Sequence, residues 1–474
     1  MRKHVLAAAI ALSIVASGCS GNKQASDVQS AVRADRSATG GDGRTEAATR
    51  SERSRSARAA AVPAAHANDA PSRRRSVAGS AQTTKSGFKY RAANLFTPAQ
   101  DRQGITPTSL TLCMHFPQLF GPAFHVLPKD FPIYWRWLND HGGIYGRKVN
   151  LIVTDDQYSP SGGVQAAQQC ASSDPPPFLI TGFLGVDTAP GVRQWAEENH
   201  QLYLSPLSTE SGFSRLRYSF GIQPSVEQLG LVLARYVAAH WPGGSAGIVW
   251  RNSPNWKGAR DTAKRVLASK GARITDLPIT ERQGNYTNEV LALKRAKATT
   301  VLAAMSPVEL IQLEKQAAEQ GYYPRWGTAT LNLTTDTIGD EMDGSKGPPA
   351  VAVIWTPEYH NGDATSPWSG EQKAMRAAYA KYDSDHTPND IDWINWLTFK
   401  LLAQMFRDCG RDCTRNKLAG MFLSGYNANP TPLCPIDFAR GGGKLGSFAF
   451  NVSTVVRRNG AAGWKQVETC KERF

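Results

Sequence analysis

The chain has 474 residues, of which 41% are hydrophobic and 20% charged. This composition can bury sizeable cores and excludes a wholly disordered protein. The formal net charge of +14 at pH 7 is concentrated at the amino-terminal end, because residues 1–105 hold 17 Lys and Arg against 7 Asp and Glu. The remainder is nearly balanced, which argues against a basic groove that binds nucleic acid.

The first nineteen residues are typical of a signal peptide. Arg2 and Lys3 form a positive start, and the apolar stretch Val5–Ala16 is too short to span a bilayer. The sequence Ser-Gly-Cys follows and is similar to the lipobox of bacterial lipoproteins, in which the cysteine is lipidated. We expect Cys19 to be a lipid anchor on the extracytoplasmic face of the cell membrane. The alternative is an ordinary secretory signal with an incidental cysteine.

A tether is expected after this signal. Residues 20–87 contain no aromatic residue and no Leu, Ile or Met. Such a segment cannot bury enough surface to offset the entropy lost on ordering. We therefore expect residues 20–106 to be a disordered basic tether between the anchor and the folded part.

The other six cysteines indicate disulfides, since the chain is expected in an oxidising compartment. Cys409 and Cys413 flank Gly410 at an expected helix end and are placed to close a small local loop. The remaining pairs are then expected to be Cys113 with Cys170 and Cys434 with Cys470, although the sequence alone does not choose among the fifteen connectivities. Zinc at the Cys-x3-Cys spacing is the alternative, but no partner pair of Cys or His lies at the usual spacing.

From residue 107 onward, expected strands and helices alternate. This order predicts an α/β fold with two doubly wound parallel-sheet units in series. In the first unit, strands are expected at 109–116, 147–154, 178–181 and 202–205, with helices at 130–140, 163–170 and 189–199. In the second, strands are expected at 246–250, 273–278, 300–304 and 350–355, with helices at 226–240, 256–270, 286–296 and 307–320. Helices at 371–382 and 391–408 then precede a loop-rich end.

Ligands of such sheets bind beyond the carboxyl ends of the strands. The loops there offer hydroxyls, backbone amides, aromatic rings and one acid, but no nucleophile elbow, Walker lysine or metal-ligand spacing. This repertoire favours binding over catalysis, and we expect neither a metal nor a cofactor. The loops are 116–124, 182–188, 205–209, 252–256 and 305–309.

Several motifs in order carry a family resemblance. The runs LNDHGGIYGRKV at 138–149 and LIVTDD at 151–156 resemble the opening of the periplasmic substrate-binding proteins of the leucine/isoleucine/valine type. Further matches are SPLST at 205–209, WKG at 256–258, and KQA at 315–317 with Gly321. The resemblance implies a type I periplasmic-binding-protein fold with two lobes and a three-segment hinge. The implied division is 107–222 and 356–444 in lobe one, and 223–355 and 445–474 in lobe two.

In lobe one, the resemblance implies that two loops hold a ligand carboxylate. Leu207 would offer its backbone and Thr209 its hydroxyl, with Ser208 beside them, unless Ser208 and Thr209 only cap the next helix. The other loop departs from the family, because Gly185 and Asp187 stand where amino-acid-binding members have a serine-rich stretch. We expect Asp187 to repel a carboxylate unless it turns away.

In lobe two, Trp256 aligns with an aromatic residue that covers the ligand and Glu309 with an acid that pairs the ligand ammonium. Glu309 is equally suited to the first turn of a helix, where the helix dipole favours an acid. Phe116, with Phe120 and Phe124, is expected to form either an apolar wall or part of the core. The remaining candidates are expected to be structural: the acids Asp155 and Asp156 as turn and cap residues, and the histidines His115 and His141.

Together these features predict an extracytoplasmic solute-binding lipoprotein rather than an enzyme. It would capture an amino acid or small organic acid between two lobes and deliver it to the permease and ATPase subunits of an ABC transporter, acting as a monomer. One alternative is a ligand sensor on the same fold. The other is a secreted α/β enzyme, which the fold class alone does not exclude.

Overall fold

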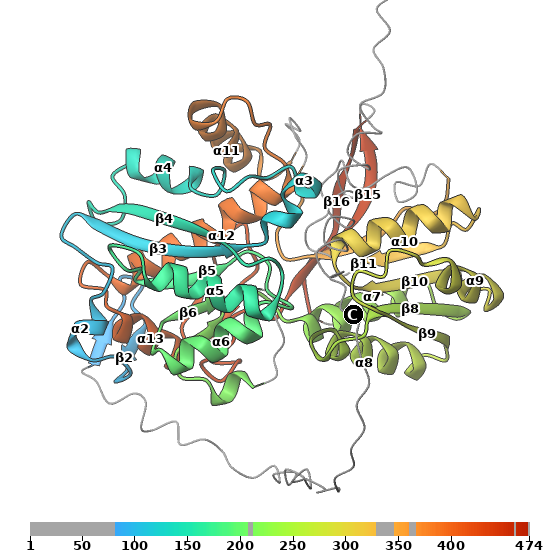
Figure 1. Cartoon of the computed structure of the whole chain (residues 1–474), viewed down its shortest axis with the longest axis horizontal. Helices are drawn as coiled ribbons and strands as arrows, with labels where there is room; N and C mark the ends of the chain where they lie inside the picture. Colours follow the sequence, from blue (N-terminus) through green and yellow to red (C-terminus); the bar gives the residue numbers. More distant parts are fainter. Residues whose placement is uncertain (1–80, 207–211, 329–345, 360–365, 459–460, 473–474) are drawn as a thin grey trace, which may run out of the picture. The chain divides into compact units, whose positions relative to one another are not determined.

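The computed structural model describes residues 81–206, 212–328, 346–359, 366–458 and 461–472, all within the unit Asn68–Phe474. Two large sheets organise this part of the chain (Figure 1). We call the first sheet with its helices lobe one. Its order is β4-β3-β5-β6-β7 and every pairing is parallel. The strands are β3 (Ser109–Phe116), β4 (Lys148–Asp155), β5 (Leu179–Gly182), β6 (Tyr203–Ser205) and β7 (Ser219–Gly221).

Helices cover both faces of the lobe-one sheet. Alternate residues of β3 therefore enter different cores: Cys113 lies in the cluster formed with α5 and α6, and Met114 in the cluster on the opposite face. Burial on both faces explains why apolar residues predominate in the inner strands of this sheet. The helices are α5 (Pro160–Ala171) and α6 (Ala189–Glu198) on one face, and α4 (Ile133–Asp140), α12 (Asp390–Cys409) and α13 (Arg415–Leu423) on the other, with α11 (Ser369–Tyr382) against α4.

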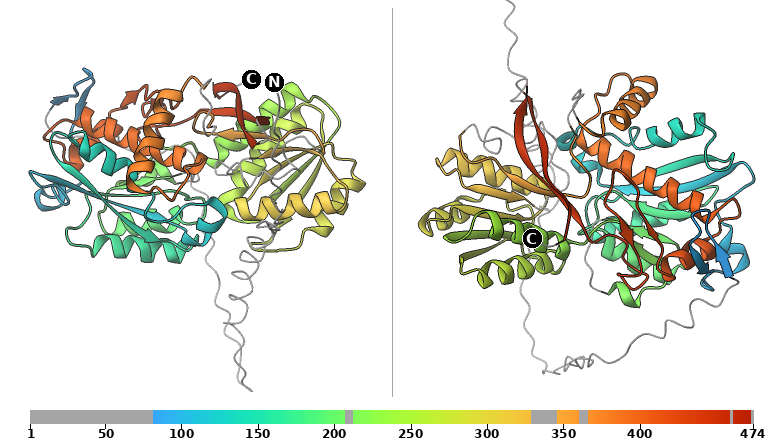
Figure 2. Two further views of the ribbon diagram at one scale, coloured as in Figure 1. Left: turned by 90° about the horizontal axis from the view of Figure 1, so that it is seen from above. Right: turned by 180° about the vertical axis from the view of Figure 1, so that it is seen from behind.

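Lobe two is built on the second sheet, whose order is β16-β15-β12-β11-β10-β8-β9. The five strands from β8 to β12 are parallel, and the last two strands of the chain add an antiparallel hairpin beside β12. The strands are β8 (Ser245–Arg251), β9 (Arg273–Ile279), β10 (Thr300–Ala304), β11 (Arg325–Thr328), β12 (Val351–Ile354), β15 (Phe450–Arg458) and β16 (Ala461–Lys471). The helices are α7 (Val226–His240), α8 (Pro254–Ser269), α9 (Thr287–Arg295) and α10 (Pro307–Glu319), drawn in yellow-green to yellow in Figure 2.

The segments that join the two sheets contact one another. The backbone N–H of Gly221, at the end of β7, donates to the carbonyl of Lys444 at 2.8 Å, and Gly446 donates back to Gly221 at 2.9 Å. The indole N–H of Trp355, just after β12, donates to the hydroxyl of Ser447 at 3.1 Å. These contacts lie near residues 222, 355 and 445, where the family resemblance implies that the chain crosses between the lobes, and the three-segment hinge stays a prediction.

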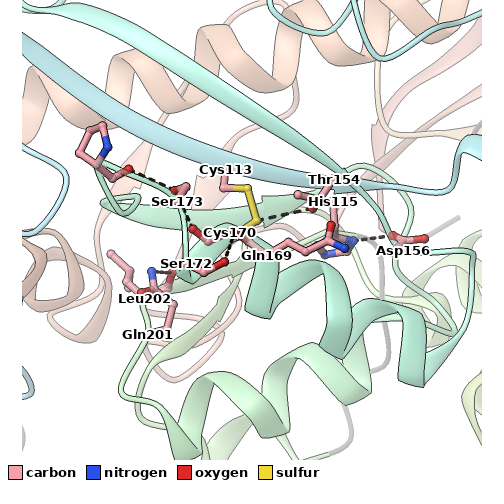
Figure 3. Close-up of a disulfide and its surroundings, with 11 residues drawn as sticks. Cys113, His115, Thr154, Asp156, Gln169, Cys170, Ser172, Ser173, Gln201 and Leu202 are labelled. Atoms are coloured by element: carbon pink, nitrogen blue, oxygen red, sulfur yellow. Dashed lines mark hydrogen bonds and ion pairs between the residues drawn. A yellow bond between two sulfur atoms is a disulfide. The ribbon is translucent and has the colours of Figure 1, made fainter.

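Within the described residues three disulfides are present, with the expected pairings Cys113–Cys170, Cys409–Cys413 and Cys434–Cys470. Cys113–Cys170 joins the centre of the lobe-one sheet to α5, and both residues are fully buried (Figure 3). The hydroxyl of Thr154 lies 3.6 Å from the Cys170 sulfur.

The expected tether extends too far into the folded part. Residues 81–106 contain β1 (Ala81–Thr83), β2 (Lys89–Arg91) and α2 (Pro98–Asp101). Tyr90 and Phe96 are buried in the lobe-one core at 5% and 4% exposure, so the segment belongs to lobe one. The aromatic residues from Phe88 onward supply the apolar surface that the preceding stretch lacks. Cys19 and the rest of the tether lie outside the described residues.

The expected loop-rich end is also wrong. Helix α13 and the hairpin β15–β16 occupy much of it, and short strands β13 (Asn427–Ala428) and β14 (Ile436–Asp437) pair between them. The hairpin strands mix apolar residues with Thr, Ser, Lys and Arg, so they lack the apolar runs of the parallel strands. Among the described helices, none combines the length and apolar character needed to cross a membrane.

Candidate functional site

The candidate site is formed by loops at the carboxyl ends of strands in both lobes. In lobe one, β5 ends at Gly182 and the following loop carries Asp187 before α6 begins. In lobe two, Arg251 is the last residue of β8, and Trp256 lies in the first turn of α8. Parallel strands present such ends at one edge of a sheet, where ligands bind.

Asp187 of lobe one is held by side chains of lobe two. Its carboxylate accepts a hydrogen bond from Arg251 Nη1 at 2.7 Å, from Asn255 Nδ2 at 3.3 Å and from the indole Nε1 of Trp256 at 3.4 Å. The residue is 7% exposed. Burial raises the pKa of Asp187, which the guanidinium of Arg251 opposes. The expected repulsive acid is thus neutralised by an ion pair and two further donors.

Arg251 is the centre of the charge network. It is 3% exposed, forms ion pairs with Asp187 and Glu281, and has its Nε 3.7 Å from Glu309 Oε1. Burial by itself lowers the pKa of this guanidinium, but the surrounding carboxylates, led by Asp187 and Glu309, outweigh it and raise the pKa. Its guanidinium carbon also lies 5.8 Å from the ring centroid of Tyr158. A buried arginine so surrounded is a fixed, permanent positive charge.

Glu309 forms the capping box at the start of α10. Its Oε2 accepts from the backbone N–H of Ser306 at 2.9 Å and from the Ser306 hydroxyl at 2.7 Å, while Oε1 accepts from the backbone of Arg282 at 3.2 Å. The interpretation as a first-turn acid is therefore confirmed by the geometry. The suggested role in pairing a ligand ammonium stays a prediction.

The aromatic residues of the first loop belong to the core. Phe116 and Phe124 are fully buried, and Phe116 packs on Phe131 with centroids 4.6 Å apart. Phe120 is 5% exposed and packs on Tyr158 with centroids 4.8 Å apart, and the ring of Tyr158 in turn lies against Arg251. Burial, followed by the charge of Asp187, raises the pKa of Tyr158 well above its usual range. The surroundings of Arg251 on the lobe-one side are therefore aromatic.

Of the remaining ligand contacts expected from the sequence, the structure describes those at Gly185 and Trp256 but not those at residues 207–209. Gly185 lies in the loop that leads into α6, where its carbonyl accepts from the backbone of Ala189 at 2.9 Å. Trp256 is 3% exposed and contributes its indole N–H to Asp187. Leu207, Ser208 and Thr209 lie outside the described residues, so their roles stay predictions.

Asp155 at the end of β4, Asp156 directly after it and the nearby histidine are structural, as expected. Asp155 accepts from the backbone N–H of Gln118 and of Gln157, both at 3.0 Å. Asp156 accepts from the backbone of Tyr158 at 2.9 Å, and its other oxygen lies 2.6 Å from His115 Nδ1 (Figure 3). His115 Nε2 lies 2.8 Å from the hydroxyl of Tyr203. His115, Asp156 and Tyr203 are fully buried, so this network stabilises the interior of lobe one.

His141 is also structural, since its Nδ1 lies 2.7 Å from the carbonyl of Trp137. Throughout the described ranges, no three His, Cys, Asp or Glu gather closely enough to hold a metal ion. Arg251 is the main residue that the sequence did not indicate. The sequence offers one local indication of Arg251, which is that this charged residue directly follows the apolar run AGIVW at 246–250.

Comparison with known proteins places this site in a family context. A family model described as periplasmic binding protein matches residues 132–447. Leu/Ile/Val-binding protein homolog 1 of Brucella abortus (strain 2308) is 27% identical over 187 residues, which is 39% of this chain and 50% of that protein. Homolog 2 of the same strain is 25% identical over 186 residues, with the same coverage. The chain thus spans about half the length of the curated relatives that it matches.

Solved structures of the same architecture extend over most of the described chain. A fatty acid ABC transporter substrate-binding protein from Thermomonospora curvata superposes with a TM-score of 0.65 at 17% identity, covering 79% of this chain and 96% of that one. A solute-binding protein of Rhodopseudomonas palustris BisB5, in complex with 3,4-dihydroxybenzoic acid, gives 0.61 at 16% identity, covering 77% and 98%. Leucine-binding protein LivK of Thermotoga maritima gives 0.58 at 13%, covering 76% and 99%. At these identities, the likeness establishes the two-lobe α/β fold.

Proposed function

Because the chain belongs to the periplasmic binding protein family, we propose that it captures a small ligand between its two lobes and presents it to an ABC-type permease. The protein acts outside the cytoplasm as a lipoprotein anchored through Cys19, works as a monomer and performs no chemistry on the ligand. Binding stabilises the closed arrangement by the difference in its affinity for the closed and open states.

The observation that carries this proposal is the meeting of strand-end loops from two different sheets. Asp187 follows β5 of lobe one, and Arg251 ends β8 of lobe two, yet their side chains are 2.7 Å apart. A ligand at this position would touch both lobes at once. Contacts from both lobes are what a binding protein that closes on its ligand requires.

The ligand class follows from the polar groups. Amino acids and small organic acids share a carboxylate, which hydroxyls, backbone amides and a buried arginine recognise well. The relatives are named for leucine, isoleucine and valine, and structural neighbours were solved with hydroxylated benzoic acids. We propose that Leu207 and Thr209 contribute from lobe one, with Trp256 and Glu309 from lobe two.

Thermal unfolding of the full chain against a ligand panel tests the proposal. The panel contains amino acids, benzoates, fatty acids, other small organic acids and sugars. A ligand at a hundred times its dissociation constant stabilises the folded state by about 2.7 kcal/mol, which raises the midpoint by a few degrees. A selective response to one acid class supports the proposal. Absence of response across the panel, with no co-purified ligand, contradicts it.

The anchor has its own test. Cys19→Ala should release the protein from the membrane fraction and abolish incorporation of a radiolabelled fatty acid. An unmodified chain that incorporates no label and is found outside the membrane fraction would show that an ordinary secretory signal is present instead.

A further inference from the structure

Three chemically different donors of lobe two converge on one carboxylate. They are the guanidinium of Arg251, the side-chain amide of Asn255 and the indole N–H of Trp256, which we call the donor triad. Their acceptor in the structure is Asp187 of lobe one, with one oxygen bound to Arg251 and Trp256 and the other to Asn255. An arrangement of this kind matches the two oxygens of a carboxylate.

Lobe two supplies its own partners for Arg251, the centre of the donor triad. Arg251 forms ion pairs with Glu281 and lies 3.7 Å from Glu309, which the capping box holds in place. Trp256 is 3% exposed, and it and Asn255 belong to the first turn of the 16-residue helix α8. The amino-terminal dipole of that helix further favours an anion there. The position of Arg251 therefore does not depend on Asp187 alone, and helix α8 carries the backbone of the other two donors.

Asp187 is held in a different way. Arg251 and the two other donors that hold its carboxylate all belong to the opposite lobe. When the lobes separate, Asp187 loses these partners, whereas Arg251 keeps two carboxylates of its own lobe. An incoming carboxylate has one side chain to displace, whereas an incoming cation would have to displace three donors from Asp187.

We propose that the donor triad is the receptor for the carboxylate of the ligand and that Asp187 is its built-in competitor, occupying the receptor until an acid displaces it. This inference rests on the proposed function and narrows the ligand class to acids. The aromatic rings beside Arg251, Tyr158 and Phe120, fit an acid with an apolar or aromatic body.

Calorimetric titration of the full chain with benzoate, L-leucine, benzamide and benzylamine tests this assignment. Asp187→Ala removes the competitor, and it leaves Arg251 compensated by Glu281 and Glu309, so the fold should persist. We expect this variant to bind benzoate or L-leucine at least about tenfold more tightly than the wild type. Benzamide and benzylamine, which lack the carboxylate, should bind neither protein.

Two further variants address the donors. Trp256→Phe keeps the ring and removes the indole N–H, and Asn255→Ala removes the amide, so each should weaken acid binding by the Asp187→Ala protein about threefold to tenfold. Asp140→Asn is the matched control, because it removes a carboxylate from an exposed ion pair with Lys381 in lobe one. This control should leave binding unchanged.

The outcomes separate the inference from the proposed function. If Asp187→Ala binds acids more weakly, or if benzylamine binds only when Asp187 is present, the donor triad is not the carboxylate site. Asp187 would then be the residue that binds a cationic group of the ligand. Benzoate binding that appears only in Asp187→Ala would support the receptor while contradicting capture of that acid by the natural protein. If Trp256→Phe and Asn255→Ala leave acid binding unchanged, the proposed function stands but the donor triad is not the carboxylate site. The assignment also fails if neither benzoate nor L-leucine binds to Asp187→Ala.

Discussion

The amine of Lys444 lies 3.9 Å from the ring centroid of Phe220 and donates to the carbonyl of Arg217 at 3.1 Å. Lys444 is 7% exposed and sits in the segment that pairs with Gly221, where the chain passes between the lobes. Burial lowers the pKa of this amine to about 7, and the charge of Glu197 opposes the change. A buried lysine at the junction of the lobes therefore costs stability whenever it is forced to carry a charge.

The sign of the resulting pH dependence follows from proton binding. In the unfolded chain Lys444 keeps its proton up to about pH 10.4, whereas in the folded chain it loses the proton at about pH 7. Between these values the unfolded state binds more protons, so the contribution of Lys444 to the free energy of unfolding increases with pH, by up to about 1.4 kcal/mol per pH unit.

Lys444→Met should therefore be more stable than the wild type near pH 7, and its advantage should shrink as the pH approaches 10. Urea unfolding of both proteins at several pH values measures this difference. Lys381→Met is the control, because the exposed Lys381 pairs with Asp140, which raises its pKa. A stability difference for Lys444→Met that stays flat between pH 7 and 10 would contradict the prediction.

The disulfides should differ in their effect on stability because they close loops of different length. Cys113–Cys170 spans 57 residues of sequence and Cys409–Cys413 spans 4. From loop-closure entropy, removing the first should cost about 4 kcal/mol and removing the second about 2 kcal/mol.

Double alanine variants of each pair, unfolded in urea without reductant, make the comparison. Both pairs are buried, so the loss of side-chain packing affects both variants. Equal losses, or a larger loss for the short loop, would show that constraint of the unfolded chain is not the main contribution.

Much of the fold was predictable because local signals agree with tertiary burial. The strand Ser109–Phe116 was predicted with its true bounds, since apolar residues predominate in it and it ends directly before Pro117. The same is true of the strand Thr300–Ala304 and the helix Val226–His240. The short strand Arg325–Thr328 was missed because its polar residues and central glycine give no local pattern, and it is stabilised by pairing with both neighbours in the sheet.

The candidate site was less predictable because its contacts join distant parts of the chain. Asp187 and Arg251 are separated by 64 residues, and no periodicity links them. The sequence identified Asp187 as an unusual acid in its loop, but the donors that neutralise it belong to the other lobe. Glu309 was better specified, since Ser306 precedes it by three residues and the capping-box pattern is local.

Glu309 provides the sharpest distinction between an acid ligand and an amino-acid ligand. Its carboxylate caps α10 and lies 3.7 Å from Arg251. Glu309→Gln keeps a side chain that can fill the capping position and removes one negative charge beside the donor triad. We expect the free energy of unfolding to fall by about 1 kcal/mol or less, comparable to the effect of weakening a cap.

The binding result depends on which ligand group meets Glu309. If the donor triad holds the only charged group of the ligand, Glu309→Gln should strengthen benzoate binding severalfold, because a like charge near the carboxylate has been removed. If Glu309 pairs with a ligand ammonium, the variant should instead weaken L-leucine binding about tenfold or more while leaving benzoate unaffected. Titration of benzoate and L-leucine into the wild type, Glu309→Gln and the cap control Ser306→Ala decides between these results. If Glu309 is purely structural, both variants should lose stability and neither should change its affinity for the two ligands.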